Sequence, residues 1–450
     1  MPPAWLQAIL NGTEKREAAP RLYAWNLSNI EGQAQLFSPP ASSRSNELTS
    51  SHHQDNSHRR IYVLGVGNLG TLFASSIASM PEPPPITLVV HRKDLLLSWS
   101  EQPGIEITRR DSIHKHLDFD VELWSEEPPS TGLKREVAQG REIRNLIVTT
   151  KASQALPTVD RIRRYLNEKS TIAFAQNGMC KLWPPHWNTY AKSRYLGALH
   201  PNWLACVTTH GVTSLGRFKS LHASEADLKI GPVLLNEFPE KSSYLSDVLC
   251  RAPILHGEKV TKDELWILQL EKLVVNSIIN PLTAILRCKN GDLFLEKEGV
   301  LAELINVLLL EAGNVLQALI KDRSTDAIIR PVSHEAALKS KVELDHEDMR
   351  RRRDLLNRVS HPQLKEMVYS VGYKVRDNTS SMLQDVRAGK QTEIDEFNGW
   401  LVDTATYLDD NLDVTHHRIL VDLLHDGKTL EKESLVKHFP FWRGFKSAAV

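Results

Sequence analysis

The sequence predicts an N-terminal α/β domain with a parallel sheet, followed by an all-α C-terminal domain. Three observations support this prediction. Short β-branched segments alternate with helical segments from residue 59 to about 258. A glycine-rich turn joins the first of these strands to the helix that follows it. The strand pattern then stops, and four helical segments are expected at 262–287, 299–321, 341–370 and 392–408.

The expected strands stand out by their apolar, β-branched composition. IYVLGVG begins at residue 61, ITLVV at 86, NLIVTTK at 145 and TIAFAQNG at 171. RYLGALH (194–200) and LACVTTHG (204–211) continue the β pattern. Strands that alternate with helices are typical of a parallel sheet with helices on both faces.

The chain divides into three regions by composition. Residues 1–58 are predicted to be an extension that is largely a disordered linker, because 38–60 is polar and rich in Ser, His and Pro. Its apolar pieces, WLQAILNG and RLYAWNL, have the composition to dock on the body as short elements. The α/β domain is expected at 59–258 and the helical domain at 259–450.

Composition argues against several classes of protein. The 55 basic residues balance 55 acidic residues, so the overall charge does not favour nucleic acid or an anionic membrane as a partner. Apolar runs stay below about 18 residues without charge, which argues against a membrane-spanning helix. Four separated cysteines indicate an intracellular protein. Glu14, Glu17 and Glu31 argue against a mitochondrial transit peptide, so the cytoplasm is favoured over the mitochondrion. The sequence shows no cluster with metal-ligand spacing, so no metal is expected.

The glycine turn is the first candidate functional site. Gly65, Gly67 and Gly70 form GxGxxG between a strand and a helix. In a dinucleotide-binding fold of the Rossmann type, these glycines would respectively make the tight turn, let the backbone approach a pyrophosphate and allow close helix packing. The helix N-terminus would then favour the phosphate charge. The predicted cofactor-binding turn comprises Gly65, Val66, Gly67, Asn68, Leu69 and Gly70.

The end of the second strand predicts which dinucleotide binds. NAD-binding folds place Asp or Glu there to accept the ribose 2′-hydroxyl. Here the strand ends in VVHRK, with Arg92 and Lys93, and the next acid is Asp94. An Arg–Lys pair would attract a 2′-phosphate that a carboxylate would repel. The sequence therefore predicts NADPH, the alternative being an ordinary solvated basic pair.

A polar stripe on an otherwise apolar helix is the candidate catalytic feature. Lys272, Asn276 and Asn280 are spaced i, i+4, i+8, so they share one helix face. Burial of a lysine lowers its pKa and makes its ammonium a better acid. Lys272 could therefore donate a proton to a carbonyl that accepts hydride. The alternative is a lysine that reaches solvent from a buried helix beside two asparagines.

Further blocks in the chain resemble the ketopantoate reductase (2-dehydropantoate 2-reductase) family, in a fungal-type form. The blocks are LGVGNLG, VVHRK, VTTK, AQNGM, EKLVVNSIINPLTAILRCKNGDL and SSMLQDVRAGKQTEIDEFNGWLV, in the family's order. Together they cover about residues 60–425. The last two are long and specific to the family, whereas the glycine turn is not.

The resemblance implies roles for individual residues. Lys272 is similar to the family's general acid, and Glu393 to the carboxylate that binds the substrate hydroxyl and supports that lysine. Asn276, Asn280, Asn378 and Ser381 are similar to substrate contacts, and Lys151 and Asn177 to cofactor contacts.

Simpler structural roles stay open for four of these residues. Glu393 could stabilise a helix N-terminus, with Thr392 as its cap; Ser381 could begin a helix, Asn177 could form a turn, and Lys151 could be a solvated strand end.

The family likeness implies NADPH-dependent reduction of 2-dehydropantoate to (R)-pantoate, a step towards pantothenate and coenzyme A. The partner would be a small 2-oxo acid, and the sequence leaves a homodimer open. Two alternatives remain: a reductase for another branched 2-oxo acid, and a non-catalytic relative that binds RNA or a mitochondrial partner. The charged insertion near 331–357 could be a solvated helix face or a basic docking patch.

Overall fold

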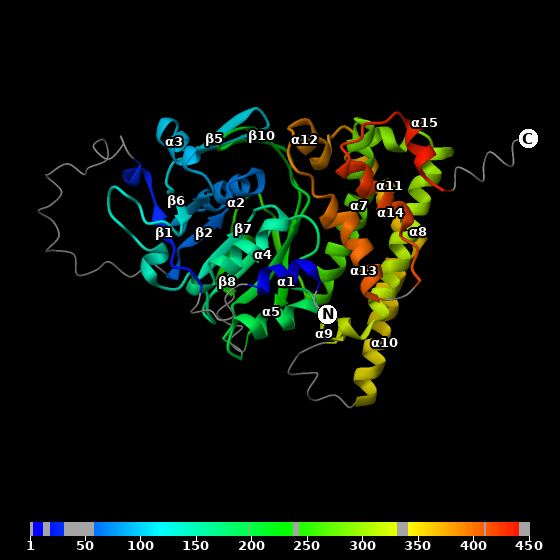
Figure 1. Cartoon of the computed structure of the whole chain (residues 1–450), viewed down its shortest axis with the longest axis horizontal. Helices are drawn as coiled ribbons and strands as arrows, with labels where there is room; N and C mark the ends of the chain where they lie inside the picture. Colours follow the sequence, from blue (N-terminus) through cyan, green and yellow to red (C-terminus); the bar gives the residue numbers. More distant parts are fainter. Residues whose placement is uncertain are drawn as a thin grey trace, which may run out of the picture. The chain divides into compact units, whose positions relative to one another are not determined.

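The computed structural model describes residues 3–11, 19–30, 58–197, 199–236, 243–330, 341–408 and 411–440. The chain forms two compact units. Unit 1 is Met1–Gln176 with Cys180–Thr261, and unit 2 is Asn177–Met179 with Lys262–Val450. Unit 1 is α/β and unit 2 is helical, which confirms the predicted fold class (Figure 1).

The described part of unit 1 contains a nine-stranded sheet. Its order is β1 (Tyr23–Trp25), β6 (Asp120–Ser125), β3 (Ile86–Val90), β2 (Ile61–Leu64), β7 (Asn145–Val148), β8 (Thr171–Phe174), β9 (Asn202–Thr208), β12 (Leu228–Leu234) and β13 (Gly257–Lys259). The strands from β6 to β9 are parallel. All four residues of β2 are buried, as expected for a parallel strand covered on both faces.

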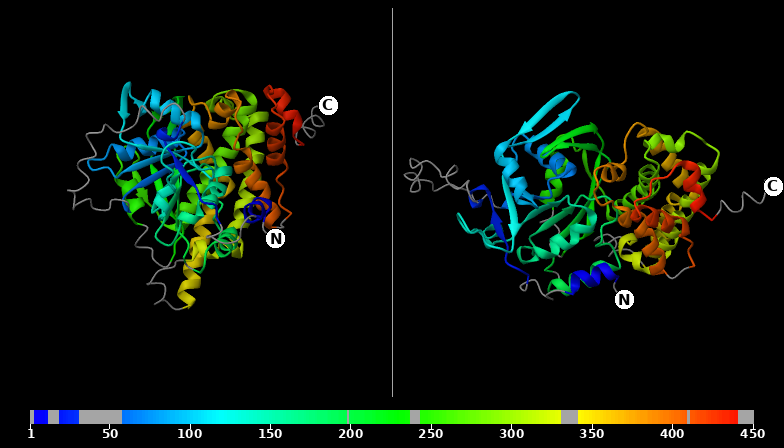
Figure 2. Two further views of the ribbon diagram at one scale, coloured as in Figure 1. Left: turned by 60° about the vertical axis from the view of Figure 1, so that its left-hand side comes forward. Right: turned by 45° about the horizontal axis from the view of Figure 1, so that its top comes forward.

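A second, four-stranded sheet lies beside helix α2 (Asn68–Ala78). Among the described residues its order is β10 (Gly211–Gly216), β11 (Lys219–Ser224), β4 (Ile105–Arg109) and β5 (Ser112–His116). Two hairpins, β4–β5 and β10–β11, meet through the parallel pairing of β11 with β4 (Figure 2). Residues more than 100 positions apart in sequence, such as Glu106 and Lys219, become neighbours in this way.

The remaining helical segments of unit 1 are α1 (Ala4–Leu10), η2 (Leu27–Asn29), α3 (Lys93–Glu101), η5 (Val137–Gly140), α4 (Ala152–Arg161), η6 (Arg163–Tyr165), α5 (His186–Arg194) and α6 (Ser243–Arg251). The strand expected at 194–200 is wrong, because α5 ends at Arg194 and the described residues that follow, 195–197 and 199–200, are not in a strand. The Arg194 guanidinium is buried and donates to Asp160 at 2.8 Å, a long-range ion pair that local strand propensity cannot report.

Part of the N-terminal extension belongs to the sheet. β1 pairs antiparallel with β6 at the sheet edge, and Leu22 and Ala24 are each 1% exposed. The backbone N–H of Leu22 donates to the Tyr165 hydroxyl at 2.8 Å. Burial of these apolar residues explains why this piece docks. The polar stretch at 31–57, on which the linker prediction rests, lies outside the described residues.

Unit 2 is built around the long helix α7 (Lys262–Leu286). The other segments are η8 (Asn290–Phe294), α8 (Val300–Lys321), η9 (Arg323–Thr325), α9 (Asp326–Ile329), α10 (Lys341–Arg358), α11 (His361–Lys374), α12 (Ser381–Arg387), a π-helical turn η11 (Asp395–Gly399), α13 (Trp400–Leu408), α14 (Thr415–His425), α15 (Lys432–Leu435) and η12 (Val436–His438). Helices α8, α11, α12 and α14 all contact α7.

The single helix expected at 341–370 is two helices. α10 ends at Arg358, and α11 starts at His361 with Pro362 in its first turn. Proline has no N–H to continue a preceding helix and its ring disfavours helical backbone before it, whereas it fits a first turn. The break therefore falls where Pro362 requires it.

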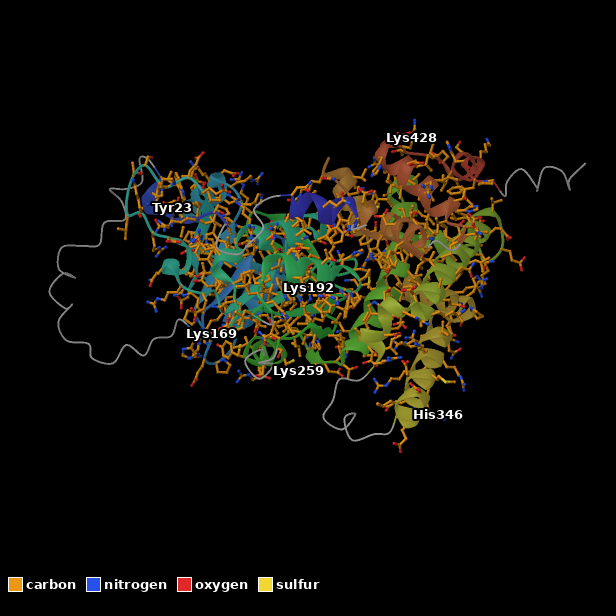
Figure 3. All side chains as sticks on the ribbon, turned by 60° about the horizontal axis from the view of Figure 1, so that its bottom comes forward. Tyr23, Lys169, Lys192, Lys259, His346 and Lys428 are labelled. Carbon is orange, nitrogen blue, oxygen red and sulfur yellow. The ribbon has the colours of Figure 1, made fainter. Side chains whose placement is uncertain are left out.

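The charged helix α10 uses several of its arginines inside unit 2. Arg358 donates to both Glu271 oxygens, at 2.9 and 3.0 Å, and to Glu264 at 2.7 Å. Arg351 and Arg352 form further ion pairs with acids of α7, α9 and α10. The N-terminal half of α10, with the exposed His346, extends past the neighbouring helices of this unit (Figure 3). For the described part of the predicted insertion, from residue 341 on, these ion pairs favour an anchored helix over a basic docking patch. Residues 331–340 lie outside the described residues.

Helix α8 is the one helix in the described chain that is long and apolar enough to cross a membrane. Of its most apolar stretch, 61% is buried inside the structure. It also carries Glu311, which is buried and 2.6 Å from His416 Nδ1. This is the environment of a core helix in unit 2.

Candidate active site

The backbone of the glycine turn suits a bound pyrophosphate. Gly65 has φ +95°, a conformation that L-residues with side chains rarely adopt. A Cβ at Gly70 would lie 2.1 Å from the Gly65 carbonyl oxygen, so only glycine lets α2 pack this closely. A Cβ at Gly67 would meet no atom within 4 Å. The backbone at Gly67, the N-cap of α2, is thus open to a phosphate group.

The structure brings Lys151 to the same edge of the sheet as this turn. The Thr149 hydroxyl, just after β7, donates to the Gly65 carbonyl at 2.5 Å. Lys151 follows as the exposed residue that precedes α4. Because β2 and β7 are adjacent and parallel, their carboxyl ends place these residues side by side.

The other residues of the predicted glycine turn have structural contacts. Val66 and Leu69 pack partly on the core, and the Asn68 side-chain amide donates to the Val212 carbonyl at 3.2 Å.

Arg92 and Lys93 lie at the end of β3, but their surroundings differ from the simple basic pair that was predicted. Arg92 Nε is 3.3 Å from Asp94 Oδ1. The Lys93 ammonium lies 4.1 Å from the ring centroid of Trp25, which comes from β1. Burial, followed by the charge of Arg92, lowers the pKa of His91. Asp94, the acid that follows Arg92 and Lys93 in sequence, thus contacts Arg92 directly.

The polar stripe on α7 has its central contact at Lys272. Lys272 Nζ donates to Asn177 Oδ1 at 2.9 Å, and Asn177 belongs to the short segment that joins unit 2. Burial lowers the pKa of Lys272 to about 8, while the charge of Glu393 acts in the opposite direction. Asn177, expected near the cofactor, therefore also orients the proposed acid. The loop fits tightly, since a Cβ at Gly178 would lie 3.0 Å from the Glu396 carbonyl.

Glu393 was expected in the first turn of a helix. The structure instead places it just before that helix. It is 8% exposed, and helical structure begins at Ile394. The turn that follows, Asp395–Gly399, is π-helical. Such turns insert one extra residue into a helix and occur frequently at functional sites. Its position gives Glu393 a direct electrostatic effect on Lys272, which a helix-capping role alone would not require.

The far end of the polar stripe on α7 contacts helix α12. The Asn280 amide is 3.4 Å from the Ser381 hydroxyl, which is exposed. The N-cap of α12 is the neighbouring Ser380, whose hydroxyl accepts from Leu383 N–H at 3.1 Å. Ser381 is thus the first helical residue, and its hydroxyl is not the cap. Asn276 is half-buried on α7.

Asn378, the other predicted substrate contact, is exposed. Its backbone carbonyl accepts from Asn290 N–H at 3.1 Å, which links the approach to α12 with η8. This bond gives Asn378 a structural role through its backbone, and the predicted contact with substrate remains a prediction.

A buried polar network near Pro281 was not expected from the sequence. Pro281 lies inside α7, so the carbonyl of Ser277 lacks its usual helical donor. The Asn398 amide, from the π-turn, donates to that carbonyl at 3.0 Å and to His417 Nδ1 at 2.9 Å. His417 Nε2 in turn lies 3.0 Å from the Leu308 carbonyl. In the sequence, Pro281 signals that a helical carbonyl loses its donor. It does not reveal which side chain replaces that donor.

The described donors suit a dinucleotide and a small polar substrate. The glycine turn offers open backbone, and the segment after β3 offers the guanidinium of Arg92. Unit 2 offers an ammonium, amides and a hydroxyl. Among the residues that the structure describes, no group of three or more His, Cys, Asp or Glu side chains could hold a metal ion.

Comparison with known proteins identifies the family. Residues 61–234 match the family model "Ketopantoate reductase PanE/ApbA", and residues 265–428 match its C-terminal counterpart. A ketoisovalerate reductase of Gibberella fujikuroi is 39% identical over 96% of this chain and 98% of its own length. A probable 2-dehydropantoate 2-reductase of Schizosaccharomyces pombe is 30% identical over 77% of this chain and 90% of its own length.

A solved structure shares the fold. The probable 2-dehydropantoate 2-reductase from Bacillus subtilis aligns with a TM-score of 0.54 at 20% identity, over 82% of this chain and all of that one. The family models together span most of the chain, and the fungal relatives match it at high coverage. The chain therefore belongs to the ketopantoate reductase family and is an NAD(P)-dependent oxidoreductase.

Proposed function

We propose that this protein reduces a short, branched 2-oxo acid to the 2-hydroxy acid, with NADPH as the hydride donor and Lys272 as the general acid. The observation that carries the proposal is the pairing of Lys272 with Asn177 at 2.9 Å, where burial lowers the pKa of the lysine to about 8. An ammonium with a pKa near working pH is well suited to donate a proton in the transition state.

The chemistry needs one hydride and one proton. When bound, reduced nicotinamide would supply the hydride for the new C–H bond at carbon 2 of the substrate. The Lys272 ammonium gives its proton to the carbonyl oxygen and stabilises the negative charge that develops there. Asn177 holds the ammonium in place, and Glu393 favours its charged form.

The other polar groups of unit 2 are proposed to orient the substrate. Asn276 and Asn280 lie one and two turns beyond Lys272 on α7. Asn280 reaches the Ser381 hydroxyl of α12, so the two form one polar edge. Neutral amide and hydroxyl donors can bind a carboxylate without raising or lowering the charge beside the lysine. We assign them to the substrate carboxylate, and Asn378 to its periphery.

We propose ketoisovalerate as the preferred substrate and 2-dehydropantoate as the second candidate. The ketoisovalerate reductase of Gibberella fujikuroi shares 39% identity over 96% of the chain, against 30% over 77% for the probable 2-dehydropantoate reductase. The two acids differ by one hydroxymethyl group. A site that binds a substrate hydroxyl rejects the analogue without it by about 10⁴-fold or more, whereas an apolar pocket discriminates by only about 10²-fold.

The test is a steady-state assay that follows the absorbance of the reduced nicotinamide. Purified full-length protein is given NADPH or NADH with ketoisovalerate, 2-dehydropantoate and a straight-chain 2-oxo acid. We expect turnover with a branched acid, higher kcat/KM with NADPH, and a strong loss of kcat in Lys272→Ala. Lys365→Ala, an exposed lysine of α11, is the matched control. Absence of turnover with both branched acids would support the non-catalytic alternative and refute the proposal.

A further inference from the structure

Arg217 and Asp94 are in direct contact although they lie 123 residues apart in sequence. Arg217 is in the turn between β10 and β11, and Asp94 is in the first turn of α3. Arg217 Nη2 lies 2.9 Å from Asp94 Oδ2, and Nη1 donates to the Asp94 backbone carbonyl at 3.2 Å. The other carboxylate oxygen, Oδ1, lies 3.3 Å from Arg92 Nε. The Asp94 carboxylate therefore lies between the guanidinium groups of Arg92 and Arg217 and contacts both.

The turn that carries Arg217 is fixed by the next residue. The Phe218 ring is 5% exposed and packs edge-on against Trp99 of α3, with ring centroids 5.1 Å apart. The Phe218 carbonyl accepts from Glu106 N–H at 2.9 Å, and Phe218 has φ +58°. Packing and backbone pairing thus hold Arg217 at the start of α3.

The charges around Asp94 bear on cofactor choice. A free carboxylate at this strand end would accept a ribose 2′-hydroxyl and repel a 2′-phosphate. Here the carboxylate is compensated twice, and both arginine side chains remain more than half exposed, at 58% and 53%. The two guanidiniums and one carboxylate leave a net positive charge at this position, which favours a phosphate group. Arg217 Nη1 also donates to the Ser98 hydroxyl. The remaining predicted cation, Lys93, lies over the indole of Trp25.

We propose that Arg217 determines the preference for NADPH: it neutralises Asp94 and supplies, with Arg92, the second guanidinium for the 2′-phosphate. The inference rests on the proposed function, since it assumes that the dinucleotide adenosine binds at the end of β3. It adds a specificity residue from the second sheet, which no motif of the dinucleotide-binding turn contains.

Four variants of the full chain test the proposal: Arg217→Gln, Asp94→Asn, the double variant, and Arg110→Gln. Arg110 is a matched control, because it is an 84% exposed arginine in the same sheet region that pairs with Glu225. Titration calorimetry gives the dissociation constants for NADP⁺, NAD⁺ and the fragment 2′-phospho-AMP. Circular dichroism melts confirm that each variant is folded.

Arg217→Gln should weaken NADP⁺ and 2′-phospho-AMP by about tenfold to a hundredfold, as expected for losing a charge-assisted hydrogen bond to phosphate. NAD⁺ affinity should stay the same or rise, because Asp94 is released to the ribose hydroxyl. Asp94→Asn added to Arg217→Gln should restore part of the NADP⁺ affinity. A purely structural role for Arg217 would give no such recovery, since the contact is absent in both variants.

Equal losses for NADP⁺ and NAD⁺ in Arg217→Gln, no loss at all, or a wild-type preference for NAD⁺ would each overturn the proposal. Failure of the proposed function has a different signature. In that case the wild-type protein would show no turnover with the branched 2-oxo acids, whichever dinucleotide it binds.

Discussion

The side-chain amide of Asn398 donates a 3.0 Å hydrogen bond to the backbone carbonyl of Ser277, four residues before Pro281. The bond replaces the helical donor that Pro281 lacks. It also fastens the π-turn after Glu393 to the segment of α7 between Asn276 and Asn280. The fully buried Asn398 therefore joins α7, which carries Lys272, Asn276 and Asn280, to the π-turn that follows Glu393.

Asn398→Ala should destabilise the protein, because it leaves the Ser277 carbonyl and His417 Nδ1 buried without this donor. Each unsatisfied group costs about 1–3 kcal/mol, so we expect a loss of about 2–6 kcal/mol in the free energy of unfolding by urea. Asn357→Ala, an exposed position near the end of α10, should change it by less than about 0.5 kcal/mol. Similar values for the two variants would contradict the role of Asn398.

The pH dependence of turnover should report Lys272. As the acid, Lys272 is active when protonated, and its pKa is lowered to about 8. We expect kcat/KM to be level below that pH and to fall about tenfold per unit above it. Stopped-flow reduction of the preferred 2-oxo acid, in buffers of constant ionic strength, measures the profile. An alkaline limb only near pH 10.5, the ordinary value for lysine, would mean that burial does not tune this group.

Glu393→Gln should move the alkaline limb to lower pH. The Glu393 carboxylate raises the pKa of Lys272 and partly offsets the lowering by burial. Its neutral isostere removes that charge with little change in shape, so the lysine should lose its proton more easily. The same pH profile, recorded on this variant, tests the prediction. An alkaline limb at the same or a higher pH in this variant would mean that Glu393 does not raise the pKa of Lys272.

Lys272→Met should stabilise the fold at neutral pH while it abolishes turnover. The folded state lowers the pKa from 10.5 to about 8, so it disfavours the charged lysine. The penalty is fully present below pH 8 and disappears as the pH rises towards 10.5. Urea unfolding should show a gain of up to about 3 kcal/mol at pH 7 that declines at alkaline pH. A gain independent of pH would indicate an origin other than the charge.

Gly67→Ala and Gly70→Ala should separate binding from folding in the glycine turn. A Cβ at Gly67 meets no atom within 4 Å, so this variant should fold normally but bind the dinucleotide weakly, because the methyl occupies the phosphate approach. A Cβ at Gly70 would lie 2.1 Å from the Gly65 carbonyl oxygen, so that variant should lose stability. Thermal melts and NADP⁺ titrations measure both. Normal NADP⁺ binding by Gly67→Ala would exclude the pyrophosphate from this position.

Local sequence patterns were sufficient for much of the fold. The strand–glycine–helix pattern at Gly65–Gly70 and the long apolar α7 were both predicted and are both present. They succeed because strand and helix periodicity and glycine backbone freedom act over a few residues. The prediction failed at 194–200, where Arg194 ends α5 and pairs, buried, with the distant Asp160.

By itself the sequence determined the two-part architecture, the stripe of Lys272, Asn276 and Asn280 on one helix face, and the basic end of the second strand. Only the tertiary structure decided what these groups meet: Lys272 meets Asn177, and the carbonyl freed by Pro281 meets Asn398. It also places Arg217 on Asp94, across 123 residues. The physical reason is that pKa shifts and hydrogen bonds depend on distances between segments remote in sequence, which no local pattern encodes.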